Sequence, residues 1–200
     1  MKKKYQAHPW HGIAAGDNIP ELITVCIEVT PFDTVKYEID KASGFLKVDR
    51  PQKYSNIVPA LYGFIPQTYC DKKIMELANS MGANATQGDN DPLDVLVLCS
   101  HNITHGNILL NAIPIGGLGL IDKGEADDKI IAVMVGDHTY GEIRDISELS
   151  KGVMNRLRHY FLTYKNLPDS PATCEIAFEY GAEHAKKVIS TSIEDYQDNF

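Results

Sequence analysis

Short apolar segments, separated by glycine and proline, dominate the first two-thirds of this 200-residue chain. They are rich in β-branched residues, which favour strands, and they are too short for helices of ordinary length. The segments lie at 22–29, 61–65, 95–98, 108–115, 118–121 and 129–135. A domain with this many short strands is expected to close its sheet into a barrel, because closure leaves no exposed sheet edge.

The segment from Lys36 to Asp40 alternates polar and apolar residues, as a half-buried strand does. Residues 41–44 end in glycine and predict a turn, and a second strand is expected at 45–50. Because side chains alternate between the two faces of a strand, Lys36, Glu38 and Asp40 should lie on one face. The predicted hairpin therefore carries a charged face.

Helical periodicity comes late in the chain. Between 147 and 166 apolar residues recur at steps of three or four, which predicts one amphipathic helix packed on the barrel. A strand at 173–178 and a closing helix at 181–193 are expected to follow. The predicted fold class is thus mainly β with α (α+β), a barrel with flanking C-terminal helices.

No linker, repeat or low-complexity run divides the chain, so one domain is expected over 1–200. Residues 67–88 are polar, with a short helix predicted at 72–78, and are expected to form an inserted surface loop. Residues 1–20 contain the sequence HPWHG at 8–12. They are interpreted as an N-terminal docking segment, since a lone tryptophan near a terminus usually buries itself.

Acidic residues outnumber basic ones, 27 to 19, which gives a formal net charge of -8. This excess argues against a protein that binds nucleic acid by neutralising phosphates. No stretch approaches the ~20 apolar residues of a membrane span. The four cysteines show no C-x-x-C pair or zinc-ribbon spacing, which favours a reducing, cytoplasmic location.

The segment from Gly88 to Asp94, which we call the acidic turn, holds Asp89, Asp91 and Asp94 directly before an apolar strand. Carboxylates this close repel one another by about 1 kcal/mol or more per pair even in water, so proteins group them chiefly around hard cations. Pro92 fixes its own φ and stiffens the turn. The sequence therefore predicts a divalent-metal site here.

Two other metal sites fit the sequence less well. An EF-hand needs glycine and glutamate at set positions of its loop, whereas residues 93–98 become apolar and strand-like. His101 and His105 have helix-like spacing, but the residues around them predict a loop, so no zinc site is expected there. The acidic turn contains no histidine or cysteine, which favours Mg²⁺ over zinc as its metal.

The acidic turn reads D-N-D-P-L-D, and it is followed by Asp122, Asp127 and Lys129 and preceded by Lys36-Tyr37-Glu38 and Asp49-Arg50. In this order the elements resemble the soluble family I inorganic pyrophosphatases, from about Glu28 to Lys165. The resemblance implies a distorted five-stranded OB-like barrel with flanking helices. It also implies Mg²⁺-dependent hydrolysis of inorganic diphosphate to two phosphates, and a homo-oligomer.

The resemblance assigns roles residue by residue. Asp91 is the implied general base, which accepts a proton from a water made acidic by magnesium. The implied metal ligands are Asp89, Asp94, Asp122, Asp127, Glu28 and Glu38. The implied substrate-binding residues are Lys36, Arg50, Tyr62, Lys129, Tyr164 and Lys165. Two positions depart from the family pattern: Val58 replaces a common tyrosine, and Lys123 replaces a common glutamate.

Two alternatives stay open on the sequence. One is a magnesium phosphohydrolase for a nucleotide or organic polyphosphate, which needs an apolar or base-stacking subsite. The other is an OB-like module for single-stranded nucleic acid, which needs a basic groove with exposed aromatic residues. The net charge of -8 opposes the second.

Overall fold

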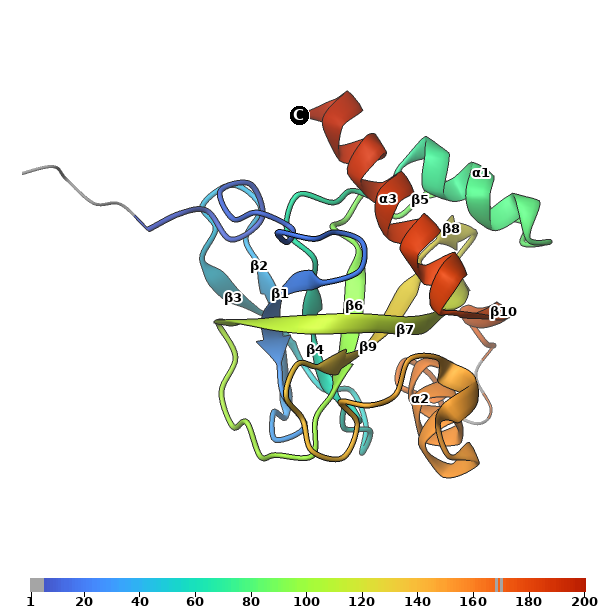
Figure 1. Cartoon of the computed structure of the whole chain (residues 1–200). Coiled ribbons are helices and arrows are strands. Elements are labelled where there is room, and N and C mark those ends of the chain that lie inside the picture. Colours follow the sequence, from blue (N-terminus) through green and yellow to red (C-terminus); the bar gives the residue numbers. More distant parts are fainter. Residues whose placement is uncertain (1–5, 168, 170) are drawn as a thin grey trace, which may run out of the picture.

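The computed structural model describes residues 6–167, 169 and 171–200. Five of its strands close into a distorted barrel (Figure 1): β1 (Ile23–Val29), β4 (Leu61–Phe64), β6 (Asp94–Leu98), β9 (Lys129–Met134) and β7 (Ile108–Asp122). Each strand pairs with the next in this order, and β7 pairs back onto β1. β6 and β9 run parallel, and the other pairs are antiparallel. The predicted five-stranded barrel is confirmed.

The strand β7 is longer than predicted. The sequence suggested two strands, at 108–115 and 118–121, but one strand of 15 residues runs through both. Gly117 and Gly119 let β7 pass close to β10 (Cys174–Gly181). A Cβ at Gly117 would meet the ring of Tyr180, and a Cβ at Gly119 would meet the ring of Phe178. These two glycines therefore permit close packing, and a separate bulge between Pro114 and Gly116 lies just before the break that the sequence suggested.

The other strands lie around this barrel: β2 (Val35–Ile39), β3 (Leu46–Pro51), β5 (Gln87–Gly88), β8 (Glu125–Ala126) and β10 (Cys174–Gly181). β2 and β3 form the predicted hairpin. Its register places Lys36 opposite Arg50. Both cations therefore lie near the open end of the hairpin, and a bulge at Asp49 of β3 follows this pair.

The helices are α1 (Lys72–Ser80), α2 (Lys151–Thr163) and α3 (Ala182–Asn199), with a short 3₁₀ helix, η1 (Ile146–Glu148). The predicted helix 147–166 begins later than expected, because Ser150 caps α2 by accepting a bond from the Val153 amide at 3.3 Å. Figure 1 shows α1 and α3 on one side of β7 and α2 on the other.

The helix α3 is longer than the predicted 181–193. The extra turns carry Asp195, whose buried carboxylate accepts bonds from the amides of Asp71, Lys73 and Ile74 at 3.0 to 3.1 Å. These amides belong to the unpaired first turn of α1, so α3 caps α1 from the side. The segment 67–88 thus holds a helix whose apolar face is buried against α3.

The core lies on both faces of the sheet. Val95 and Val97 of β6 pack in the cluster that α1 and α3 cover, whereas Leu96 and Leu98 pack in the cluster that α2 covers. This alternation follows the two-residue period of a strand. Both faces of β6 are buried, so this strand is rigid. The acidic turn ends at its first residue, Asp94, and is therefore held firmly at that end.

The N-terminal segment docks on the C-terminal helix. Trp10 is 2% exposed, and its indole Nε1 donates to the carbonyl of Thr68 at 2.8 Å. Its ring packs against Tyr69, Tyr196 and Phe200. Residues 1–5 of the predicted docking segment lie outside the described residues.

Candidate active site

The acidic turn is held in shape by hydrogen bonds. The Asp91 amide donates to Asp89 Oδ1 at 3.0 Å, across Asn90, whose φ of 60° is left-handed. The Cys70 amide donates to the Asp91 carbonyl at 2.9 Å, and the Tyr69 hydroxyl donates to the Asn90 side chain at 2.9 Å. Asparagine tolerates this backbone conformation better than most residues. The turn therefore presents its carboxylates in fixed positions.

Most of the predicted site residues line one cavity of about 330 Å³, enclosed by strands of the barrel and the end of α2. They are Asp89, Asp91, Asp94, Asp122, Asp127, Lys36, Arg50, Tyr62, Lys129, Tyr164 and Lys165. Its wall carries both carboxylates and cations. Such a wall suits a polyanionic substrate that binds together with metal cations.

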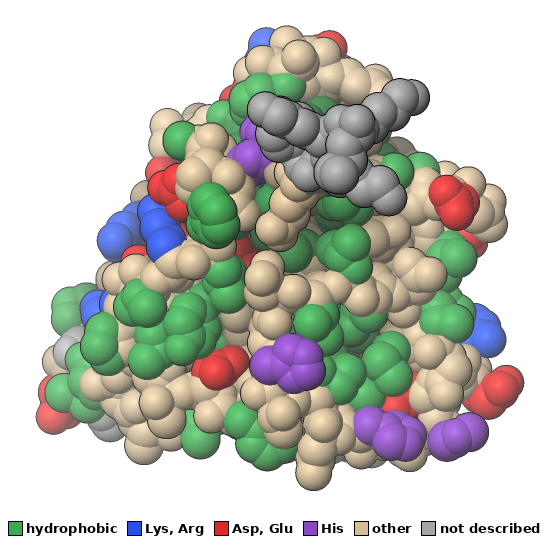
Figure 2. Space-filling model, turned by 90° about the vertical axis from the view of Figure 1, so that its left-hand side faces the viewer, with side chains coloured by type: hydrophobic (Ala, Val, Ile, Leu, Met, Phe, Trp, Pro, Cys, Tyr) green, Lys and Arg blue, Asp and Glu red, His purple; other side chains and the backbone are tan. Residues whose placement is uncertain are grey.

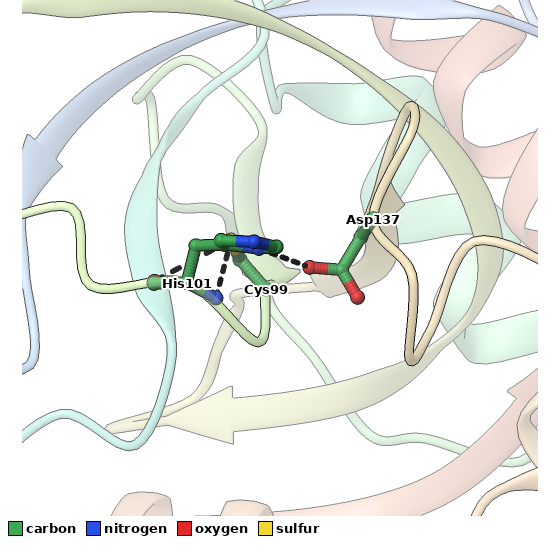
Figure 3. A group of neighbouring side chains, drawn as sticks. All are labelled: Cys99, His101 and Asp137. Carbon is green, nitrogen blue, oxygen red and sulfur yellow. Dashed lines mark hydrogen bonds and ion pairs between the residues drawn. The ribbon is translucent and has the colours of Figure 1, made fainter.

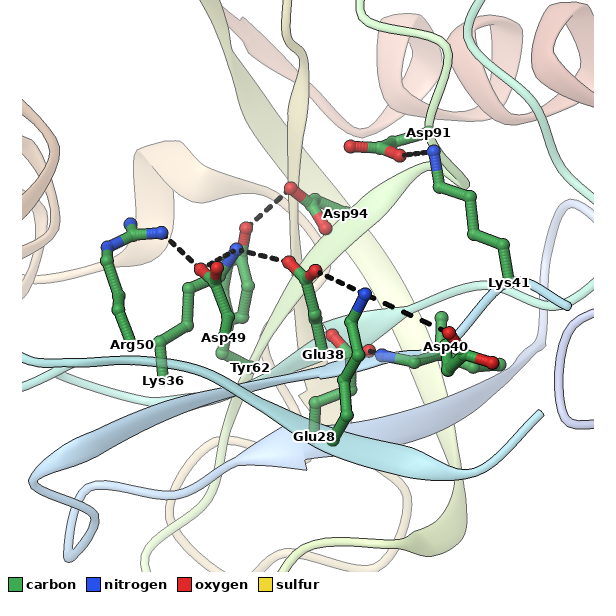
Figure 4. Close-up of polar contacts among 12 residues, drawn as sticks. Glu28, Lys36, Glu38, Asp40, Lys41, Asp49, Arg50, Tyr62, Asp91 and Asp94 are labelled. Atoms are coloured by element: carbon green, nitrogen blue, oxygen red, sulfur yellow. Dashed lines mark hydrogen bonds and ion pairs between the residues drawn. The ribbon is translucent and has the colours of Figure 1, made fainter. Parts of the chain in front are cut away.

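The remaining two predicted ligands, Glu28 and Glu38, line a neighbouring cavity of about 410 Å³. Asp91 and Asp94 line both cavities (Figure 4). Glu38 pairs with Lys36 at 3.3 Å. The structure thus places Glu28 and Glu38 on the far side of Asp94 from Asp122 and Asp127.

Glu28 is almost fully buried, and its Oε1 accepts the Ile39 amide at 2.6 Å. Burial, together with the negative charge of Asp94, raises the pKa of Glu28 to about 8. A cation in the second cavity would favour its charged form.

Lys129 lies between two of the predicted metal ligands, Asp94 and Asp127. Its side chain is 3% exposed, and its ammonium contacts both Asp94 and Asp127. Burial by itself lowers the pKa of this ammonium, but the charges of Asp127 and Asp94 outweigh it and hold the pKa well above its usual value. Tyr62 also donates to Asp94, at 2.5 Å. The ammonium therefore occupies the space between two predicted metal ligands.

The pKa values of Asp89 and Asp127 are shifted in opposite directions. Burial and the neighbouring Asp127 raise the pKa of Asp89 well above its usual value. Burial also raises the pKa of Asp127, but Lys129 and a hydrogen bond from Asp89 outweigh burial and hold this pKa below its usual value. The carboxyl groups of Asp89, Asp94 and Asp127 thus interact with one buried ammonium, that of Lys129.

Asp89 and Asp127 are hydrogen-bonded to each other, but no three of the described carboxylates in this cavity bring one ligand atom each within 4.8 Å of the other two. Among the described residues, the one trio of His, Cys, Asp or Glu whose ligand atoms all lie within 4.8 Å of one another is found elsewhere. Lys129 separates Asp94 from Asp127, so a metal ion shared by these carboxylates requires the ammonium to move.

The residues present fit a hard divalent cation. Asp122 Oδ2 accepts a bond from Lys165, but its Oδ1 is buried and has no hydrogen-bond partner among the described residues. An orphaned carboxylate oxygen is costly unless something binds it. All six predicted ligands are carboxylates, the donor type that Mg²⁺ prefers over thiolate or imidazole.

A lysine that contacts the acidic turn was not among the predicted site residues. Lys41, in the turn of the β2–β3 hairpin, forms an ion pair with Asp91 and donates to the Asn90 carbonyl at 3.0 Å (Figure 4). No motif marks Lys41, because its proximity to the acidic turn depends on how the hairpin folds over the barrel. The two departures from the family pattern, Val58 and Lys123, both line the first cavity.

A family model of inorganic pyrophosphatase matches residues 25–197. The chain is 52% identical over 200 residues to the inorganic pyrophosphatase of Chlamydia caviae, covering 96% of this chain and 92% of the relative. The crystal structure of the inorganic pyrophosphatase from Thermus thermophilus matches with a TM-score of 0.79 and 28% identity, covering 96% of this chain and 99% of that one. An inorganic phosphatase from Anaplasma phagocytophilum matches with a TM-score of 0.78 and 31% identity, covering 92% and 99%. The family model, the sequence identity and the shared fold agree, and the chain belongs to the inorganic pyrophosphatase family.

Proposed function

We propose that this pyrophosphatase hydrolyses inorganic diphosphate to two phosphates in a reaction that requires Mg²⁺. The first cavity is lined by both carboxylates and cations, and one buried carboxylate oxygen of Asp122 has no hydrogen-bond partner among the described residues. A polyanion cannot bind beside several carboxylates unless divalent cations accompany it.

Asp89, Asp94 and Asp127 would hold magnesium, with Asp122 joining Asp127, while Glu28 and Glu38 would serve an outer ion from the second cavity. When bound, magnesium supplies charge neutralisation and makes water more acidic. Asp91 lies at the mouth of both cavities with its carboxylate 50% exposed. It accepts the proton of the attacking water as the general base.

Cationic and hydroxyl side chains hold the substrate. Lys36, Arg50 and Lys165 present positive charge to the cavity, and Lys129 does so once it leaves its carboxylate partners. Tyr62 and Tyr164 offer hydroxyl groups to phosphate oxygens. These groups orient the two phosphates and stabilise the charge that develops as the bridging bond breaks.

The direct test is phosphate release from diphosphate, measured with Mg²⁺ and with excess chelator. We expect turnover only with Mg²⁺, and turnover in excess chelator would contradict the proposal. A nucleoside triphosphate and an organic diphosphate serve as competing substrates. Faster release from either would favour the alternative phosphohydrolase.

Arg50→Lys should lower kcat/KM by about tenfold or more, although it conserves charge. The guanidinium can hold two phosphate oxygens at once, whereas an ammonium acts as a point charge. Steady-state kinetics would measure the loss, with Lys53→Arg as a control for an Arg–Lys exchange at a neighbouring position of the cavity rim. Unchanged kinetics would show that Arg50 does not hold substrate.

Lys123→Glu should lower the Mg²⁺ concentration needed for half-maximal activity. Lys123 is exposed, lines the first cavity and directly follows Asp122, so its charge opposes a cation bound at that carboxylate. The change should be largest at low ionic strength, where screening is weakest. Mg²⁺ titrations at two salt concentrations would test this, and curves that superimpose at low salt would contradict it.

We further propose that the chain forms a homo-oligomer. Leu109 and Val135 are 51% and 48% exposed, and the Val135 amide bonds to Asn111 of β7, so both lie near the start of that strand. Figure 2 shows hydrophobic side chains in several surface groups on the side of the molecule where β7 begins. Sedimentation velocity would measure the mass in solution, and a monomer would contradict the proposal.

The four cysteines are unpaired, which supports the proposed location in a reducing cytoplasm. No described helix is long and apolar enough to cross a membrane. The proposed partner is inorganic diphosphate, and no binding of nucleic acid is expected from a chain with a net charge of -8.

A further inference from the structure

We infer that Cys99, His101 and Asp137 form a second metal site, for a borderline-soft cation such as Zn²⁺. One ligand atom from each residue lies within 4.8 Å of the other two (Figure 3). None of the three lines the cavity that holds the acidic turn. The inference is therefore independent of the proposed reaction.

The barrel brings these residues together. β6 and β9 are adjacent and parallel, with Leu98 opposite Val133, so the segments that follow the two strands leave the sheet at the same edge. Cys99 and His101 follow β6, and Asp137 follows β9. The site would link the ends of two strands whose beginnings carry Asp94 and Lys129.

The Asp137 carboxylate is fully buried and held in place by backbone amides. Its Oδ1 accepts from Thr139 and Tyr140 at 2.9 and 2.8 Å, and its Oδ2 accepts from Ser100 at 2.7 Å. Burial raises the pKa of this carboxyl, but the hydrogen bonds outweigh burial and hold the pKa well below its usual value. A permanent negative charge thus faces His101 Nδ1 at 3.5 Å.

One hydrogen bond to the Asp137 carboxylate can be broken without moving the backbone, which leaves an oxygen lone pair free to bind a cation. Asp137 Oδ2 also accepts the Ser100 hydroxyl, at 2.8 Å. A hydroxyl can rotate without disturbing the backbone, and the freed oxygen could then bind a cation while the amide bonds remain. The turn that Asp137 organises would keep its shape.

The other two ligands also suit the ion. The His101 amide donates to Cys99 Sγ at 3.3 Å, which fixes the sulfur beside the imidazole in the same turn. Thiolate, imidazole and carboxylate are zinc ligands, and three of them with one open position make a tetrahedral set. His138 follows Asp137, and its ring lies 6.0 Å from that of His101, so it can supply the fourth ligand.

The site is accessible. The side chain of His101 is 60% exposed, and Cys99 and His101 line a surface cavity of about 210 Å³. Burial raises the pKa of the Cys99 thiol, so binding must displace the thiol proton to solvent, as is usual for zinc thiolates. Cys26, Cys70 and Cys174 are buried and do not compete.

Co²⁺ provides the test, because a bound thiolate gives it a sulfur-to-metal absorption band in the near ultraviolet that carboxylates do not give. The intact protein is titrated with Co²⁺ in excess Mg²⁺ and a non-thiol reductant, so that hard-cation sites are filled. We expect the band in the wild type and in His105→Ala, a matched control from the same loop. We expect its loss in Cys99→Ser and at least about tenfold weaker binding in His101→Ala.

A second readout is competition for Zn²⁺ with a coloured chelator, in which Cys99→Ser should bind one Zn²⁺ fewer per chain. Circular dichroism and diphosphatase activity confirm that each variant is folded, since the altered residues lie outside the active-site cavity. A wild type without the band overturns the inference, and so does a band that survives Cys99→Ser.

Discussion

Asp91→Asn is expected to lower kcat by about 10²- to 10⁴-fold, the usual loss for a general base. Asparagine has nearly the same shape, but it cannot accept a proton from water. The carboxylate is half exposed, and its ion pair with Lys41 is exposed too, so the substitution should cost little stability. The backbone bonds that shape the acidic turn do not use this side chain.

Turnover and the Mg²⁺ dependence should be measured together. The account predicts a large fall in kcat with a nearly unchanged Mg²⁺ requirement. Asp17→Asn is the matched control, because Asp17 is exposed and lines neither cavity. Wild-type turnover in Asp91→Asn would show that Asp91 has only a structural role.

Asp127→Ala is expected to raise the Mg²⁺ concentration for half-maximal activity by about 10²-fold or more. Changing a residue that merely supports a metal ligand typically costs ten- to a hundredfold in affinity, and Asp127 is placed to bind directly. The substitution also leaves the buried ammonium of Lys129 with Asp94 as its nearest carboxylate. Asp94 would then be held more strongly in its ion pair and be less available to magnesium.

Mg²⁺ titration of activity measures this effect, and Asp94→Ala should behave similarly. His101→Ala is the control, because His101 lies outside both cavities. A shift in His101→Ala that matches the shift in Asp127→Ala would place the magnesium site elsewhere.

The sequence predicted the elements whose pattern is local. The β2–β3 hairpin follows from alternation, and the barrel strands follow from short β-branched runs. The continuity of β7 depends on packing of Gly117 and Gly119 against Tyr180 and Phe178, which no local pattern shows. The length of α3 depends likewise on Asp195 reaching the first turn of α1.

The site residues could be named because their order along the chain matches a known family. Their arrangement could not be predicted. The position of Lys129 between Asp94 and Asp127 depends on the pairing of β6 with β9. The contact of Lys41 with Asp91 depends on where the hairpin crosses the acidic turn. The contacts of Lys129 with Asp94 and of Lys41 with Asp91 each join segments that are far apart in sequence.

Diffraction from crystals soaked in Mn²⁺, a hard cation with an anomalous signal, would show whether the first cavity binds divalent cations. Asp89, Asp94 and Asp127 are proposed to hold divalent cations, which requires Lys129 to release its carboxylates. We expect anomalous peaks among these three side chains and at Asp122, with the Lys129 ammonium moved away from Asp94 or Asp127. Crystals with no peak in this cavity, and with Lys129 still paired to both carboxylates, would contradict it.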